Sequence, residues 1–408
     1  MFSARASWDL TPSPFAERVA RARASGAALF DLTNANPASL AAPGAALAEA
    51  LAEVARSPAA RSYQGDPLGD RSAREAIAAY HRAGGAQIAA EQIVLTAGTS
   101  EGYAHLFRVL ADPGDLVHLP APGYPLFEHL AELEGLHCAR YRLREPRTGD
   151  ARWPLDLDGL ASSLAPNSRA VLAIHPHNPT GSFVAASDLA SLRAVCAERE
   201  LALLSDEVFA DSAPEGAGAP SFLVDAAAGP LTCVLSGASK VLGVPQLKVA
   251  WIAVSGPPAL RDEALARLEF AADAYLSVSP LVARTLPALF ARRGEIRAAL
   301  NGRVAANRAA LSRALQSIAG VSVLPAEAGW ASIVRVENGG ARAGWRNDEE
   351  LALALLEQAR VLIHPGALFE LDAGPHALPL VANLLAPPDE FAQGARSLAQ
   401  FLATRLAA

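Results

Sequence analysis

The chain has 408 residues, carries a net charge of −7, and is 51% hydrophobic and 19% charged. This balance is typical of a folded globular protein of two or three domains and excludes a disordered, collagen-like or small disulfide-stapled chain. The acidic charge, with no basic stripe, argues against nucleic acid as a partner, and no apolar run reaches the roughly 18 residues of a membrane span. The first ten residues lack the apolar core of a secretory signal, so we expect a cytoplasmic protein.

The basic residues are almost all arginines. Of the 35 Lys and Arg residues only Lys240 and Lys248 are lysines, and both lie in the segment 236-SGASKVLGVPQLK-248. Arginine stays protonated, whereas a desolvated lysine amine can lose its proton and act as a nucleophile. We therefore expect chemistry in this segment. The three cysteines are far apart and form no CxxC pair, so we expect free thiols and no metal site.

The first 90 residues have helical and turn patterns. Helices are predicted over 15–30, 45–56 and 71–82, and the Pro- and Asn-rich stretch 33–44 forms turns. From residue 91 on, short apolar runs alternate with helical sequence. The runs are 93–98, 116–120, 170–175, 201–207, 232–237 and 249–254. Near-continuous apolar strands separated by helices predict βαβ units and a sheet that is buried on both faces.

The last third of the chain has a different pattern. After helical sequence to about residue 318, strand-like and helical segments follow one another to a final helix. The segments are strands 321–325, 331–337, 361–366 and 378–385, with a helix over 348–360. They predict an α+β domain to which the N-terminal arm also belongs. We expect a large domain over residues 45–285 and a discontinuous small domain made of 1–44 and 286–408.

Polar or glycine residues follow five of the predicted strands. They are Gly98-Thr99-Ser100, Tyr124, Asn178, Asp206 and Lys240. In parallel α/β sheets ligands bind outside the carboxyl ends of the strands, so these residues predict one shared pocket. A helix starting near Ser100 offers free N–H groups to a phosphate. A carboxylate after a buried strand, such as that of Asp206, needs a partner.

The order of these motifs resembles the class I and II aminotransferases, which are pyridoxal-phosphate (PLP) enzymes of fold type I. The resemblance extends from Thr33 to the C-terminal helix, and five separate motifs carry it together. It implies an α/β fold with a mostly parallel seven-stranded sheet between helices and a smaller α+β domain. It also implies PLP as the cofactor.

The resemblance implies a role for each motif residue. Lys240 would form the internal aldimine with PLP and then act as general acid and base. Asp206 would bind the protonated pyridine nitrogen, Asn178 the 3′-oxygen, and Tyr124 would stack on the ring. The phosphate would be held by the remaining motif residues: Gly98, Thr99, Ser100, Ser239, Lys248, and Ser236, which lies one residue out of the usual register. Tyr63 matches a tyrosine that reaches the phosphate of the neighbouring subunit, which implies a homodimer with shared sites.

Two positions depart from the family pattern. Phe209 stands where many members have a tyrosine that donates to the 3′-oxygen, so we predict that the aldimine keeps its proton to higher pH than in those relatives. Val381 stands where the family has the arginine that binds the substrate carboxylate, with Asn383 near the serine of that motif. We consider Arg335 as a replacement. Ala35 and Asn36 lie where the N-terminal segment of the family closes over the substrate, and Asn36 could bind a carboxylate oxygen.

We therefore predict an aminotransferase that moves an amino group between an amino acid, or a related amine, and a 2-oxo acid. The alternative is another PLP reaction of secondary metabolism, namely elimination, replacement, decarboxylation or oxidation, which Phe209 and Val381 favour. A regulator of this fold would carry a DNA-binding domain ahead of it. Fewer than about 35 residues precede the matching region and the charge is acidic, so we do not expect a regulator. The donor, the acceptor and the pathway stay open.

Overall fold

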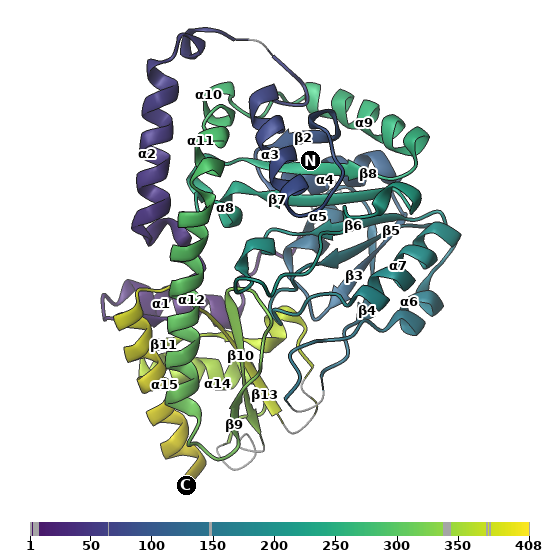
Figure 1. Ribbon diagram of the computed structural model, residues 1–408. Helices are drawn as coiled ribbons and strands as arrows, with labels where there is room; N and C mark the ends of the chain where they lie inside the picture. The colour runs from purple at the N-terminus through teal and green to yellow at the C-terminus, as the bar shows by residue number, and fades with distance from the viewer. Residues whose placement is uncertain are drawn as a thin grey trace.

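The computed structural model describes residues 2–407 except 3–7, 64, 147–148, 338–343, 373 and 375–376. Seven strands form the large sheet, and helices cover both of its faces (Figure 1). Their order across the sheet is β2 (Ile93–Thr96), β8 (Ala250–Ser255), β7 (Thr232–Gly237), β6 (Ala202–Asp206), β5 (Ser168–Ile174), β3 (Leu116–Ala121) and β4 (His137–Arg142). Neighbouring strands are parallel except that β8 runs antiparallel to β2 and β7. This confirms the predicted mostly parallel seven-stranded sheet of an α/β fold.

The central strands are apolar because both of their faces are covered. Alternate side chains enter two separate cores: Leu203 and Val234 lie in one, and Leu204 and Leu235 in the other. One face is covered by α4 (Thr99–Leu110), α5 (Leu126–Leu133) and α9 (Pro258–Asp273). The other is covered by α3 (Arg71–Ala83), α6 (Leu157–Ser163), α7 (Ala186–Glu198), α8 (Ala238–Val241), α10 (Pro280–Ala283) and α11 (Leu286–Ala291).

A smaller sheet lies at the other end of the molecule (Figure 1). Its strand order is β12 (His364–Pro365), β13 (Ala377–Asn383), β10 (Ala331–Glu337) and β9 (Val321–Val323), and all neighbours are antiparallel. A separate parallel pair joins β1 (Phe30–Asp31) to β11 (Val361–Leu362). The remaining helices are α1 (Pro14–Ala24), α2 (Ala41–Arg56), α12 (Arg293–Leu315), α14 (Asp348–Ala354), which continues as a π-helix over Leu355–Ala359, and α15 (Pro388–Ala407).

The long helix α12 connects the two halves and packs against α15 (Figure 1). The domain boundaries near residues 44 and 285 remain predictions. No helix in the described part of the chain combines the length and the apolar character that a membrane crossing requires.

Three segments differ from the sequence-based expectation. The helix predicted over 15–30 ends at Ala24, because Gly26 adopts a positive φ of 70° and the chain then forms β1. Strand β4 was missed, because it is an edge strand with only Tyr141 buried and has no apolar run. The segment 361–366 is two short strands in different sheets rather than one.

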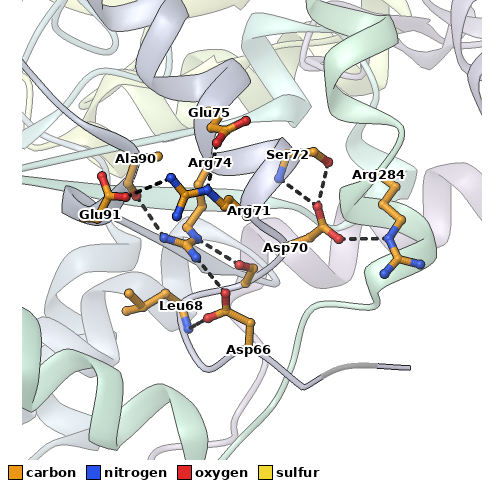
Figure 2. Close-up of polar contacts among 11 residues, drawn as sticks. Asp66, Leu68, Asp70, Arg71, Ser72, Arg74, Glu75, Ala90, Glu91 and Arg284 are labelled. Atoms are coloured by element: carbon orange, nitrogen blue, oxygen red, sulfur yellow. Dashed lines mark hydrogen bonds and ion pairs between the residues drawn. The ribbon is translucent and has the colours of Figure 1, made fainter. Parts of the chain in front are cut away.

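A polar network holds the loop that precedes α3 (Figure 2). The guanidinium of Arg74, which is only 5% exposed, donates to Gly69 O at 2.8 Å, Ala90 O at 3.1 Å and Asp66 Oδ2 at 2.6 Å. Asp70 caps the helix by accepting from Ser72 N at 3.0 Å. The segment 66–70 is therefore held against the start of α3.

Replacing Arg74 with alanine is expected to lower the free energy of unfolding by about 2–3 kcal/mol, because the buried carbonyl of Ala90, the half-buried carbonyl of Gly69 and the carboxylate of Asp66 lose their donor. The matched control is Arg71→Ala on the same helix, whose side chain is 66% exposed and pairs with Glu75. An exposed pair of this kind contributes little, so this variant should unfold close to wild type. Urea unfolding followed by tryptophan fluorescence measures both. Equal midpoints for the two variants would contradict the structural role of Arg74.

Candidate active site

A cavity of about 590 Å³ lies at the carboxyl end of the large sheet, between that sheet and the smaller one. Its volume is within the usual range of sites for small molecules and cofactors. The large-sheet side contributes Thr99, Tyr103, Tyr124, Pro125, Leu126, Phe127, Ile174, Asn178, Asp206, Val208, Phe209, Gly237, Ser239, Lys240, Pro245 and Ala250. The facing side contributes Thr33, Ala35, His364, Leu368, Phe369 and Asn383.

Lys240 lies on the short helix α8 and reaches the cavity with its amine. The Nζ atom donates to Ala35 O at 3.3 Å and lies 5.0 Å from the ring centre of Trp330 and 5.7 Å from that of Phe209. Burial lowers the pKa of Lys240 from 10.5 to about 8, against the opposing effect of Asp206. At pH 7 roughly one amine in ten is therefore neutral, compared with roughly one in several thousand for an ordinary lysine. A neutral amine is what a nucleophilic or basic lysine requires.

Asp206 ends strand β6 and faces the same cavity. Its Oδ2 accepts from the Tyr103 hydroxyl at 2.9 Å and its Oδ1 from Val208 N at 3.1 Å. Burial raises the pKa of Asp206 from 3.8 to about 6. A cationic ligand group placed against this carboxylate would offset the cost of burying its charge.

Tyr103 was missed in the sequence analysis. It lies four residues after Thr99 on α4, and both side chains line the cavity because residues four apart share a helix face. That spacing was a signal available in the sequence.

The first turn of α4 can bind an anion. Gly98 precedes the helix, Thr99 begins it, and its N–H groups have no partner within the helix. A Cβ atom added to Gly98 would lie 3.6 Å from Lys248 Nζ, so the second lysine of the chain lies beside this turn. Ser239 lines the same cavity. A helix N-terminus and an ammonium group together favour a phosphate.

Four predicted phosphate ligands are not among the residues that line the cavity: Gly98 and Lys248, which lie beside the first turn of α4, and Ser100 and Ser236. Ser100 is half-buried on α4 and is not among the lining residues. The prediction for Ser236 needs correction. Its hydroxyl is buried within β7 and donates to Glu207 O at 3.3 Å, because its place in the strand directs it away from the cavity.

The residues expected around the ring lie together. Tyr124, Asn178 and Phe209 all line the cavity, and the Tyr124 ring is 6.0 Å from that of Phe127. His177 was missed: its Nδ1 lies 3.0 Å from Thr180 Oγ1 and its Nε2 3.0 Å from Pro122 O. It therefore ties the turn of Asn178 to the turn of Tyr124. Burial lowers the pKa of His177 to about 4, so the ring is neutral at pH 7.

The two residues predicted to close over the substrate have different positions. Ala35 lines the cavity and accepts the hydrogen bond from Lys240. Asn36 is exposed and its Oδ1 accepts from Ala38 N at 3.0 Å, which caps the 3₁₀ turn Pro37–Ser39. The structure does not bring Asn36 to the substrate cavity.

Tyr63 lies outside this cavity. It is 70% exposed and borders a separate hollow of about 270 Å³ together with Asp66 and Ser277. Contact between Tyr63 and a phosphate at α4 of another subunit remains a prediction.

The prediction that Arg335 replaces the carboxylate-binding arginine is wrong. Arg335 pairs with Glu145 and lies 3.4 Å from Glu337, away from the cavity lining. Val381 is fully buried on β13, where it pairs with Ile333 of β10 on one side and His364 of β12 on the other. Among the described residues that line the cavity there is no arginine.

Residues 31–378 match the model of the aminotransferase class I and II family, so the chain belongs to this family. It is 25% identical over 325 residues to the glutamate-pyruvate aminotransferase AlaA of Escherichia coli K12, covering 79% of this chain and 78% of that protein. It is 30% identical over 215 residues to the S-alkyl-thiohydroximate lyase SUR1 of Arabidopsis thaliana, covering 51% of this chain. The chain spans less than half (44%) of the length of that relative.

Solved structures show the same fold. The alanine aminotransferase from Pyrococcus furiosus superposes with a TM-score of 0.85 at 23% identity, covering 99% of this chain and all of that one. The N-succinyldiaminopimelate aminotransferase from Mycobacterium tuberculosis gives a TM-score of 0.79 at 25% identity, covering 98% of this chain and 100% of that one. The fold of the chain is thus that of the aminotransferases.

Proposed function

We propose that this protein is a PLP-dependent aminotransferase that transfers an amino group between an amino acid and a 2-oxo acid. The chain belongs to the aminotransferase class I and II family, and one observation supports the proposal further. The amine of Lys240, with its lowered pKa, shares a cavity with the buried carboxylate of Asp206 and with the anion site at α4. Elimination and the other non-transaminating reactions are not favoured.

The donor set of the cavity fits PLP. Thr99 N–H, Ser239 and Lys248 would hold the phosphate, Asp206 the protonated ring nitrogen, and Asn178 the 3′-oxygen. Tyr124 would lie against the ring face. When bound, PLP supplies an aldehyde that links to amines and a ring that accepts the electron pair released at the substrate carbon.

The protein residues then have distinct tasks. Lys240 Nζ takes the proton from the substrate Cα and later returns a proton, because its lowered pKa lets it hold either state near neutral pH. Asp206 would place its negative charge against the ring nitrogen, and the Tyr103 hydroxyl holds the carboxylate in place by donating to Oδ2. Leu126, Phe127 and Phe369 line the cavity with apolar surface, which would exclude water once the ligands are bound.

The protein is further proposed to act as a homodimer with shared sites. Tyr63 and three other large side chains are exposed on neighbouring segments; the three are Tyr275 (52%), Leu276 (51%) and Leu281 (44%). A monomer rarely leaves such a group uncovered without a partner. Cross-linking or sedimentation tests this state. A cytoplasmic location remains a prediction from the sequence.

Transfer of ¹⁵N tests the proposed reaction. The PLP-loaded protein is mixed with single ¹⁵N-labelled amino acids and an unlabelled 2-oxo acid, and the products are identified by mass spectrometry. We expect the label in the amino acid formed from the acceptor, together with the 2-oxo acid of the donor. Label recovered only as ammonia, or release of an olefin or peroxide, would overturn the proposal.

Replacing Phe209 with tyrosine is expected to lower the pH midpoint at which the visible absorption of the PLP-loaded protein changes. Phe209 lines the cavity and offers no donor, whereas a tyrosine hydroxyl would stabilise the deprotonated form by donating to the 3′-oxygen. One hydrogen bond of about 0.5–1.5 kcal/mol corresponds to a shift of about 0.4–1 pH unit. Phe209→Leu, which adds no donor, is the control. An unchanged midpoint in Phe209→Tyr would contradict this role.

A further inference from the structure

The cavity has an unusual shortage of positive charge for an enzyme whose substrate carries a carboxylate. Its described lining residues include two basic side chains, Lys240 and His364. Lys240 is already assigned to proton transfer, and Lys248 lies beside Gly98 at the phosphate end. His364 is therefore the one basic side chain of this lining that has no task in the proposed reaction.

His364 lies at the place of the arginine that the chain lacks. Strand β12 is antiparallel to β13, and the register sets His364 directly opposite Val381. Val381 shares its strand face with Asn383, two residues on, whose side chain lines the cavity. A side chain on the neighbouring strand thus reaches the region that an arginine at position 381 would serve.

The other polar side chains on this wall are already engaged. Asn383 Nδ2 donates to Thr33 O at 2.9 Å, and the Thr33 hydroxyl donates to Asp31 Oδ1. In contrast, no hydrogen bond to another described residue acts on the ring of His364, which is affected only by burial and by the charge of Asp31. The ring is half-buried and packs edge-on against Phe369, with the ring centres 5.8 Å apart. The ring is therefore held in place with its nitrogens available to a ligand.

We propose that His364 binds the α-carboxylate of the substrate in place of the usual arginine, and that the substrate is an amino acid with an apolar side chain. An imidazole N–H donates one hydrogen bond to a carboxylate, whereas a guanidinium donates two. Burial lowers the pKa of His364, and the nearby charge of Asp31 opposes this effect. The inference rests on the proposed amino transfer.

The apolar specificity follows from the rest of the lining. Phe369 packs against His364, and Leu126, Phe127 and Leu368 line the same cavity. None of these four side chains offers a charge to a second carboxylate. An unpaired carboxylate on such a surface would cost several kcal/mol of binding free energy. Leucine or phenylalanine should therefore react faster than glutamate when each is the labelled donor.

The test measures binding without turnover, so that it is independent of the reaction. The affinities of 3-phenylpropanoate and its neutral amide for the PLP-loaded protein are measured by calorimetry. We expect wild type to prefer the carboxylate by about 10- to 100-fold, as one hydrogen bond to a charged group predicts. His364→Phe should lose this preference, with a larger loss of affinity for the carboxylate than for the amide. His364→Gln, which keeps a donor, should retain most of it.

Equal affinity of wild type for the two compounds would overturn the proposal, whatever the variants do. An equal loss of affinity for both compounds in His364→Phe would also overturn the proposal, because such a loss would show that His364 has a purely steric role. Glutamate reacting as fast as leucine would overturn the apolar specificity. Failure of the proposed function has a different signature, namely selective carboxylate binding with no transfer of ¹⁵N.

Discussion

The Lys240→Ala variant is expected to lose amino transfer by at least about 10³-fold while still folding. Lys240 contributes both the nucleophilic amine and the general acid–base group, and general acid–base catalysis alone contributes about 10²–10⁴-fold. Its side chain ends in the cavity and makes one hydrogen bond, to Ala35 O, so its removal leaves the core intact. The rate of ¹⁵N transfer measures the loss.

The second lysine of the chain provides the matched control. Lys248→Arg keeps a cation beside the predicted phosphate site and should keep activity and cofactor binding. Borohydride reduction of the PLP-loaded protein, followed by peptide mass spectrometry, should find the cofactor on Lys240 in wild type and in Lys248→Arg, and on no residue in Lys240→Ala. A stable adduct on Lys248 would contradict the assignment of the two lysines.

The Asp206→Asn variant is expected to show the second largest loss, about 10²–10³-fold in the rate of amino transfer. The asparagine keeps the shape of the side chain, and its single oxygen can still accept one of the two hydrogen bonds, from Tyr103 or from Val208 N. It has no charge to pair with a protonated ring nitrogen. Loss of one partner from a buried ion pair costs about 3–5 kcal/mol, and each 1.4 kcal/mol is a factor of ten. Single-turnover rates measure this loss, and saturating PLP ensures that weaker cofactor binding does not affect the measured rate.

The adjacent carboxylate serves as the control for this variant. Glu207 is also buried, but its Oε1 accepts from Phe222 N at 2.8 Å and it does not line the cavity. Burial raises the pKa of Glu207 to about 7, so half of the groups are protonated at neutral pH and glutamine is a close substitute. Glu207→Gln should transfer amino groups at nearly the wild-type rate. An equal loss in both variants would indicate that Asp206→Asn acts through folding.

The sequence alone determined the fold class and the residues with the strongest chemistry. The scarcity of lysine directed attention to Lys240 and Lys248. The apolar runs predicted parallel strands, and the carboxyl ends of such strands meet at one edge of the sheet. This rule is sufficient to predict that Asp206, Asn178, Thr99 and Lys240 lie together, and the structure places all four in one cavity.

Only the tertiary structure decided which residues face that cavity from the smaller sheet. Alternation along a strand separates its two faces but does not say which face meets the cavity. Arg335 lies on β10 and pairs with Glu145, away from the cavity, whereas His364 lies on the short strand β12 and lines it. Tyr103 and His177 likewise act on residues far away in the chain, Asp206 and Pro122. Contacts over such sequence distances depend on how helices and sheets pack, and no local pattern encodes them.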